Sequence, residues 1–276
     1  MKISSISIKN FRRLNQVSID FSKDVTIFVG ANNSGKTSAI EAMAKFLSIR
    51  QFSFYDFSVC HRSTINDIGQ GWLTSLDEHF PDFEEWVNIL PTMDVWLSVS
   101  DSDYHYIRDL IPTLDWDGQQ IGVRLIYQPK DINKLFTEFR EAKNSQEPVK
   151  ELDLFPKNLC DFLNKFVKED FQVQAYLLSD SKAEFDSDLK TNKANPLLDL
   201  IQVDVIAAQR GFYDADTSYR SQQNKLSDQL VRYYEKHLNP ERSPSKEDIE
   251  LIKTAIYAQK AFDDSLAQQF KKPIED

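Results

Sequence analysis

The residues that could do chemistry are concentrated in one glycine-containing stretch, Gly30-Ala-Asn-Asn-Ser-Gly-Lys-Thr, which matches the pattern G-x-x-x-x-G-K-[ST]. Gly30 and Gly35 allow the backbone to turn tightly and to bring its N–H groups against phosphate oxygens. The pattern places Lys36 within reach of the β- and γ-phosphates of a nucleotide, and it places the Thr37 hydroxyl on Mg²⁺. The stretch therefore predicts a site for ATP and Mg²⁺.

The residues around this loop form the expected contact set for the nucleotide. Arg12 and Arg13 belong to it because arginine presents a planar fork of donors that suits phosphate or ribose oxygens, although a solvated surface pair explains them equally well. The full set is Arg12, Arg13, Gly30, Asn32, Asn33, Ser34, Gly35, Lys36, Thr37 and Ser38.

A strand must lead into such a loop and a helix must follow it. Residues 25–29, Val-Thr-Ile-Phe-Val, form a short continuous apolar run, which predicts a fully buried strand. After the loop, apolar residues recur at helical spacing at Ile40, Met43, Ala44 and Leu47. The N-terminus of that helix would add a partial positive charge to the site. This context favours a nucleotide site over a chance match.

Alternating apolar residues predict the strands that surround this core. Ile6 and Ile8 define one half-buried strand, and Val17, Ile19 and Phe21 define a second, with a turn at 10–15 between them. We expect these two strands to form an antiparallel sheet stacked on the nucleotide-binding core. Further strands are predicted at 95–99, 122–127, 173–178 and 201–207, helices within 131–170 and 245–270, and an exposed loop at 179–195.

The aromatic-rich stretch 52–90 is expected to be irregular and to pack in the core. Aromatic residues that stack on nucleic-acid bases are expected to alternate with Lys or Arg, and only Arg62 is nearby. Gln209 follows the predicted strand 201–207. A glutamine at a strand end can place its amide oxygen on Mg²⁺ or orient an attacking water, although it can also be an ordinary polar residue there.

Composition and charge narrow the class of protein. The chain has 276 residues with 41% hydrophobic residues, enough for one large domain or one and a half. No apolar run approaches the ~20 residues of a membrane span, and the N-terminus does not read as a signal peptide, so we expect a cytoplasmic protein with reduced Cys60 and Cys160. Residues 1–50 carry eight Lys/Arg and three acidic residues, within a chain of net charge −10. A broad DNA-binding surface is therefore not expected in the acidic remainder.

The opening Ile6-Ser-Ile-Lys-Asn-Phe-Arg-Arg-Leu14, followed by an alternating strand and the loop, resembles ABC-type ATPase heads of the SMC/RecF kind. Within that group it is most similar to the OLD (overcoming lysogenization defect) family, ATPases usually followed by a Toprim nuclease domain. The resemblance implies an α/β P-loop NTPase with a mixed sheet, antiparallel N-terminal strands and a C-terminal helical arm. It implies a head, first lobe, over 1–210 and an arm over 211–276. It gives Lys36 and Gln209 catalytic roles, with Thr37 and Gln209 on the metal.

The sequence also departs from that family. Leu226-Ser-Asp-Gln lacks the glycines of a signature loop, and neither an apolar strand ending in Asp-Glu nor a Toprim-like acidic cluster is present. In such heads these parts follow the arm. We therefore expect either a piece of a longer protein or a natural half-protein completed by a partner, and inefficient hydrolysis by this chain alone.

Three hypotheses about function follow. The first is the ATP-binding region of an OLD-like DNA nuclease in DNA processing or anti-phage defence, with nucleotide state controlling head dimerisation. Its partners would be further copies, joined through heads and arm, and DNA bound by regions outside this chain, with no membrane. The second is a nucleotide-gated interaction module without nuclease activity. The third is a small-molecule P-loop kinase, which the antiparallel opening strands suit less well.

Overall fold

The computed structural model describes residues 1–48, 51–74, 83–111, 116, 120–144, 155–178, 185–203, 254 and 257. The chain divides into two compact units, one made of Met1–Thr137 with Asn158–Ile206 and the other of Glu138–Lys157 with Ala207–Asp276. The sheet and the glycine-containing loop belong to the first unit, and most of the second lies outside the described residues. Within the described part of the chain, no helix is long and apolar enough to cross a membrane.

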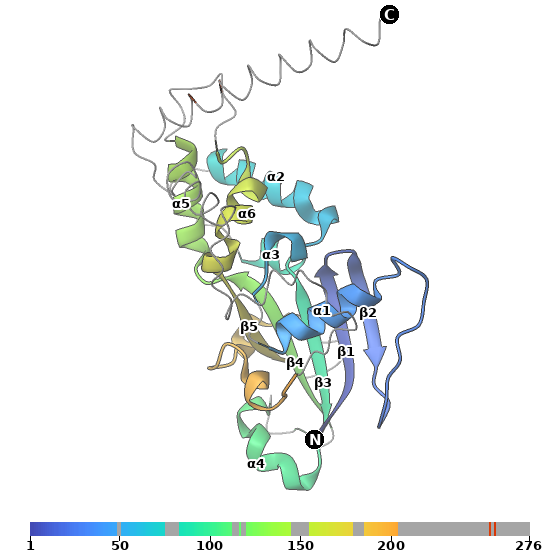
Figure 1. Cartoon of the computed structure of the whole chain (residues 1–276). Coiled ribbons are helices and arrows are strands. Elements are labelled where there is room, and N and C mark those ends of the chain that lie inside the picture. The colour runs from blue at the N-terminus through green and yellow to red at the C-terminus, as the bar shows by residue number, and fades with distance from the viewer. Residues whose placement is uncertain are drawn as a thin grey trace, which may run out of the picture. The chain divides into compact units, whose positions relative to one another are not determined.

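A five-stranded sheet forms the centre of the first unit, with the strand order β2-β1-β3-β4-β5 (Figure 1). Every pairing in it is antiparallel, so the expected antiparallel start is confirmed, whereas no parallel part of a mixed sheet occurs in the described residues. The predicted strands at 95–99, 122–127 and 173–178 are confirmed. The strands are β1 (Lys2–Phe11), β2 (Leu14–Asp20), β3 (Thr92–Ser98), β4 (Gln120–Pro129) and β5 (Phe171–Leu178).

The helices of the described chain include the one predicted after the loop. The α-helices with described bounds are α1 (Lys36–Phe46), α2 (Arg62–Thr74), α3 (Glu84–Val87), α4 (Tyr104–Ile107), α5 (Ile132–Asn144) and α6 (Leu159–Asp170). Helix α1 lies across one face of the sheet and contacts β1 and β3 (Figure 1). Helix α2 lies in the stretch 52–90, which was expected to be irregular, so that expectation is wrong for these residues. A helix forms there because Ile65, Gly69 and Trp72 recur at helical spacing and can be buried on one face.

The face of the sheet under α1 carries an aromatic core. The rings of Phe52 and Tyr127 stack with centroids 4.2 Å apart, and Phe46, Phe57 and Phe171 pack around them. All five side chains are buried. Within the stretch 52–90 the expected core role is confirmed for Phe52, Phe54, Phe57, Trp72 and Trp86, whereas Tyr55 is 67% exposed and the expectation is wrong for it. Because large rings dominate core energetics, this cluster fixes α1 on the sheet.

The opposite face of the sheet is also buried, but it is polar. Arg124 on β4 lies directly across from Asp94 on β3, and its guanidinium donates two hydrogen bonds to the carboxylate, at 2.6 and 2.9 Å. On the same face the Tyr176 hydroxyl donates to Oε1 of Gln128 across 3.0 Å. Buried polar groups are stable only when they are paired in this way.

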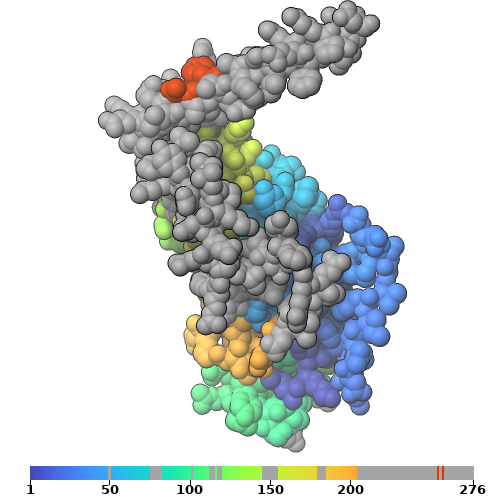
Figure 2. Space-filling model, in the orientation of Figure 1, coloured from blue at the N-terminus to red at the C-terminus, as the bar shows by residue number. Residues whose placement is uncertain are grey.

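The predicted buried strand at 25–29 is wrong. The segment is irregular, and the side chains of Val25, Ile27 and Val29 are 70%, 77% and 88% exposed. A buried strand needs neighbours on both sides, and none of the five strands pairs with this segment in the described structure. Figure 2 shows the blue segment that contains it at the molecular surface.

Two other expectations fall largely beyond the described chain. Residues 201–203 are described and are not a strand, while 204–210, with Gln209, are outside the described residues. The predicted arm at 211–276 also lies outside the described residues, apart from Thr254 and Tyr257, which are helical.

Candidate functional site

The glycine-containing loop connects the exposed segment 25–29 to α1. Gly35 is the N-cap of α1 and has φ +92°, and Asn33 before it has φ +65°. These left-handed conformations suit glycine and are tolerated by asparagine. A Cβ on Gly35 would also lie 2.8 Å from Cδ2 of Leu14. The left-handed backbone conformation therefore favours glycine here, and any Cβ would also displace the end of the Leu14 side chain.

The Lys36 side chain folds back over the loop. Its Nζ donates to the carbonyl oxygens of Gly30 and Ala31, at 2.7 and 2.6 Å, and to Oγ of Ser34 at 3.2 Å. All three acceptors are oxygens of the loop itself. Because phosphate oxygens are stronger acceptors for an ammonium than neutral carbonyls are, a phosphate entering the loop can replace them. The lysine thus lies over the loop, and its contact with the β- and γ-phosphates stays a prediction.

The backbone N–H groups of the loop are open to a ligand. In the described structure, the Ser34 N–H donates to the carbonyl of Ala31 across 3.3 Å, while the N–H groups of Asn33, Lys36 and Thr37 meet no protein acceptor. The first N–H groups of a helix have no intrahelical partner and attract anions. This set of free N–H donors around an ammonium fits a nucleotide phosphate.

The residues expected to complete the site are exposed or undescribed. Thr37, the expected Mg²⁺ ligand, is exposed, as is Asn32, and Ser38 is half-buried in the first turn of α1. Gln209, the other expected metal ligand, lies outside the described residues. The described part of the chain holds no group of three or more His, Cys, Asp or Glu side chains that could bind a metal.

Arg12 points toward α1 and pairs with two carboxylates. Its guanidinium contacts Glu41 of α1, and its Nε donates to Oδ1 of Asp56 across 2.9 Å. Arg12 itself has φ +53°, at the turn between β1 and β2. Arg13 is exposed and has no ion-pair partner in the described chain. The expected contact of either arginine with a nucleotide stays a prediction.

Asp56 is the residue near this site that sequence reasoning missed. Its carboxylate has no exposed surface and accepts from Arg12, from Lys45 Nζ at 2.8 Å and from the Ser53 N–H at 2.8 Å. Ser53 and Asp56 form a capping box, a spacing that could have identified the residue in the sequence. Through Arg12 and Lys45, Asp56 binds the β1–β2 turn and the last turn of α1 together.

Asn10, next to the same turn, has a structural role. It has φ +56°, and its Nδ2 donates to the carbonyl of Asn88 across 2.8 Å. Its Oδ1 lies 2.9 Å from Nε2 of His61, and burial lowers the pKa of that histidine below its ordinary value. A neutral His61 can donate to Asn10 and hold the turn in place.

A phosphate loop at the N-terminus of a helix that packs on a sheet defines a nucleotide-binding α/β domain. The chain belongs to the AAA ATPase domain family, whose model matches residues 1–276. The expected class of P-loop ATPase is thereby confirmed, and it implies nucleotide binding.

Two individual proteins are similar to parts of the chain. It is 42% identical over 43 residues to the DNA replication and repair protein RecF of Lactococcus lactis subsp. lactis (strain IL1403), a stretch that makes up 16% of this chain and 12% of RecF. The chain therefore matches only a small part of that relative's length. A chain solved in work on ATP-driven dimerization and DNA-stimulated activation of SMC ATPases is 14% identical, covers 72% of this chain and 76% of its own length, and has a TM-score of 0.32.

Proposed function

We propose that this chain is the ATP-binding region of an OLD-like DNA nuclease, in which nucleotide state controls the pairing of ATPase heads during DNA processing or anti-phage defence. The observation that carries the nucleotide part is the loop, where the Lys36 ammonium is ringed by three loop oxygens beside open N–H groups. Membership of the AAA ATPase domain family supports the same conclusion. The similarity to RecF over 43 residues fits a role on DNA.

In this proposal each residue of the loop has a defined task. The open N–H groups of Asn33, Lys36 and Thr37 bind the phosphates, and Lys36 exchanges its carbonyl acceptors for β- and γ-phosphate oxygens. Thr37 and Gln209 hold Mg²⁺. Mg²⁺, when bound, neutralises the negative charge of the phosphates. Lys36 and Gln209 are the proposed catalytic residues. We expect slow turnover, because a signature loop and a catalytic Glu after an apolar strand are missing from the sequence.

The exposed segment before the loop supports a composite site. Val25, Ile27 and Val29 present three apolar side chains to solvent directly before Gly30. Large apolar side chains that are this exposed and this close together in the chain are candidates for an interaction surface. We propose that further protein, from a second copy or from a partner, covers this segment when heads pair. The proposed head covers 1–210 and the proposed arm 211–276.

The same segment favours a second candidate function, a nucleotide-gated interaction module that does not cleave DNA. Both candidate functions use the phosphate loop, and they differ in whether the ATPase region acts together with a nuclease. Purified full-length protein that binds MgATP but never cuts plasmid DNA, alone or with its genomic neighbours, would favour the module. ATP-dependent cutting that needs Lys36 would favour the nuclease.

Calorimetric titration of MgATP into the wild-type chain and Lys36→Ala tests the shared part. We expect at least tenfold weaker binding for Lys36→Ala, because the ammonium contacts the most highly charged part of the ligand. Lys23→Ala is the matched control, since it removes an exposed lysine outside the loop and should leave the affinity unchanged. Equal affinity for the wild type and Lys36→Ala would overturn the nucleotide site.

A further inference from the structure

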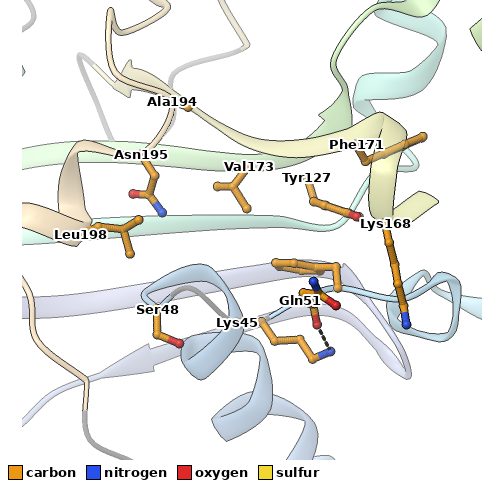
Figure 3. A pocket seen from close by; sticks show the side chains of 11 residues that line it. Lys45, Ser48, Gln51, Tyr127, Lys168, Phe171, Val173, Ala194, Asn195 and Leu198 are labelled. Atoms are coloured by element: carbon orange, nitrogen blue, oxygen red, sulfur yellow. Dashed lines mark hydrogen bonds between the residues drawn. The ribbon is translucent and has the colours of Figure 1, made fainter. Parts of the chain in front are cut away.

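A cavity of about 300 Å³ lies beside the last turn of α1 (Figure 3). The phosphate loop is at the other end of that helix, where Gly35 is the N-cap. Its walls come from α1, β4, β5, the end of α6 and the loop at 194–198. All of these segments belong to the first compact unit. A helix of 11 residues is about 16 Å long, so the cavity is separate from the nucleotide site.

One side of the cavity is aromatic and apolar. The stacked rings of Phe52 and Tyr127 line it together with Phe171, whose centroid lies 5.5 Å from that of Tyr127. Val173 and the half-exposed Leu198 add aliphatic surface (Figure 3). A flat apolar molecule can bury its face against such a wall.

The tyrosine in this wall has no polar group to offer the ligand. Burial, with the charges of Asp56 and Asp170, raises the pKa of Tyr127 far above its ordinary value. Its hydroxyl is already bound, since it donates to the carbonyl of Val167 across 2.9 Å. The Tyr127 side chain therefore stays neutral and contributes only the small apolar part of its ring that lines the cavity.

Two lysines supply positive charge at the edge of the cavity. Lys45 Nζ donates to the Gln51 carbonyl (Figure 3) and to Asp56, each across 2.8 Å. An ammonium has three N–H donors, so one remains for a ligand. Lys168 is exposed and pairs with no carboxylate in the described chain. Arg12 shares Asp56 with Lys45 and also pairs with Glu41, so these four side chains balance in charge and the unpaired positive charge at the cavity comes from Lys168.

From this combination we infer that the cavity binds a small aromatic anion, a single flat ring system that carries a carboxylate, sulfonate or phosphate group. The ring lies on the wall formed by Phe52 and Tyr127, and the anionic group lies between Lys45 and Lys168. The volume is at the small end of the range for ligand pockets, which restricts the ligand to one or two fused rings. The ligand would contact the helix that begins at the phosphate loop.

Titration of the full chain with 1-naphthoate and with the uncharged 1-naphthalenemethanol tests this inference. We expect saturable one-to-one binding of naphthoate, and three- to fivefold weaker binding to Lys168→Gln, the effect of one exposed charge. Naphthalenemethanol should bind both proteins equally. Lys2→Gln, an exposed lysine that does not line the cavity, is the matched control.

A second variant locates the probe. Val173→Trp fills the cavity and should abolish naphthoate binding, while far-UV circular dichroism checks that the variant folds. Lys36→Ala should bind naphthoate like the wild type, which separates this site from the phosphate loop. The inference is overturned if naphthoate does not saturate the wild type, or if folded Val173→Trp or Lys168→Gln binds it as tightly as the wild type does.

Discussion

Arg12 donates from Nε to Oδ1 of Asp56 across 2.9 Å, so a turn on the surface is bound to a carboxylate without any exposed surface. The same guanidinium contacts Glu41, and the same carboxylate accepts from Lys45. Glu41 and Lys45 are one helical turn apart on α1. The phosphate-loop helix is thus held to the β1–β2 turn along its length by ion pairs as well as by the aromatic core.

Replacing Asp56 by Asn should destabilise the protein strongly. The amide cannot neutralise Arg12 and Lys45, and breaking a buried charge network costs about 3 kcal/mol. Urea unfolding followed by fluorescence measures the free energy of unfolding. Asp109→Asn is the control, because Asp109 pairs with Arg108 at the surface, where both side chains are over 80% exposed. A similarly small loss for both variants would contradict the role assigned to Asp56.

Gly35→Ala should weaken MgATP binding and lower stability by about 1–2 kcal/mol. Alanine is strained at φ +92°, and its Cβ would lie 2.8 Å from Leu14. Gly71→Ala within α2 is the matched change, since a Cβ there meets nothing within 4 Å. It should stabilise the protein by about 0.5–1 kcal/mol. Thermal unfolding measures the change in stability, and calorimetry measures the affinity for MgATP. A Gly35→Ala variant as stable as the wild type would contradict the left-handed conformation of Gly35.

Ile27→Ser should leave the free energy of unfolding within about 0.5 kcal/mol of the wild-type value, because the side chain is 77% exposed. The same change at Ile8, which has no exposed surface, should cost about 3 kcal/mol or more. If residues 25–29 are covered on head pairing, Ile27→Ser should also reduce MgATP-dependent dimers in light scattering. Equal destabilisation by the two variants would show that residues 25–29 are packed as a buried strand.

Alkylation of Cys160 should accelerate about tenfold for each pH unit between 7.5 and 9.5 without levelling off. Burial raises the pKa of this thiol to about 11, against the opposing charge of Arg62, and only the thiolate reacts. Its Sγ also donates to the Arg62 carbonyl across 3.3 Å. Peptide mass spectrometry after iodoacetamide treatment measures the rate, with the exposed Cys60 as the internal reference. A plateau for Cys160 below pH 9.5 would contradict this pKa.

The sequence predicts the sheet well because each strand carries its own signal. Ile6 and Ile8 alternate with polar residues, and they pair with Val95 and Met93 as two-residue periodicity requires. The loop can also be predicted from the sequence, since phosphate binding requires glycines and a lysine at fixed spacing. The prediction of a buried strand at 25–29 was wrong because this segment does not carry a signal of its own for burial. Its burial depends on neighbouring strands, and local apolarity cannot show whether these are present.

Contacts between distant segments were also beyond prediction. Arg12 is bound by Asp56, 44 residues away, and an arginine beside a phosphate loop does not reveal which anion it will meet. The cavity beside Lys45 needs the end of α6 and the loop at 194–198 to come close to α1. Contacts of this kind depend on how the chain is folded as a whole, and local residue types and spacing do not reveal them.

The buried pair of Asp94 and Arg124 restricts how β3 and β4 can align. A slip of one residue would turn Arg124 toward the aromatic face, and a slip of two would leave two buried charges without partners. Apolar pairs such as Val95 with Val123 would tolerate either slip far better. The ion pair therefore contributes more to alignment than to net stability, and it excludes misregistered sheets while the chain folds.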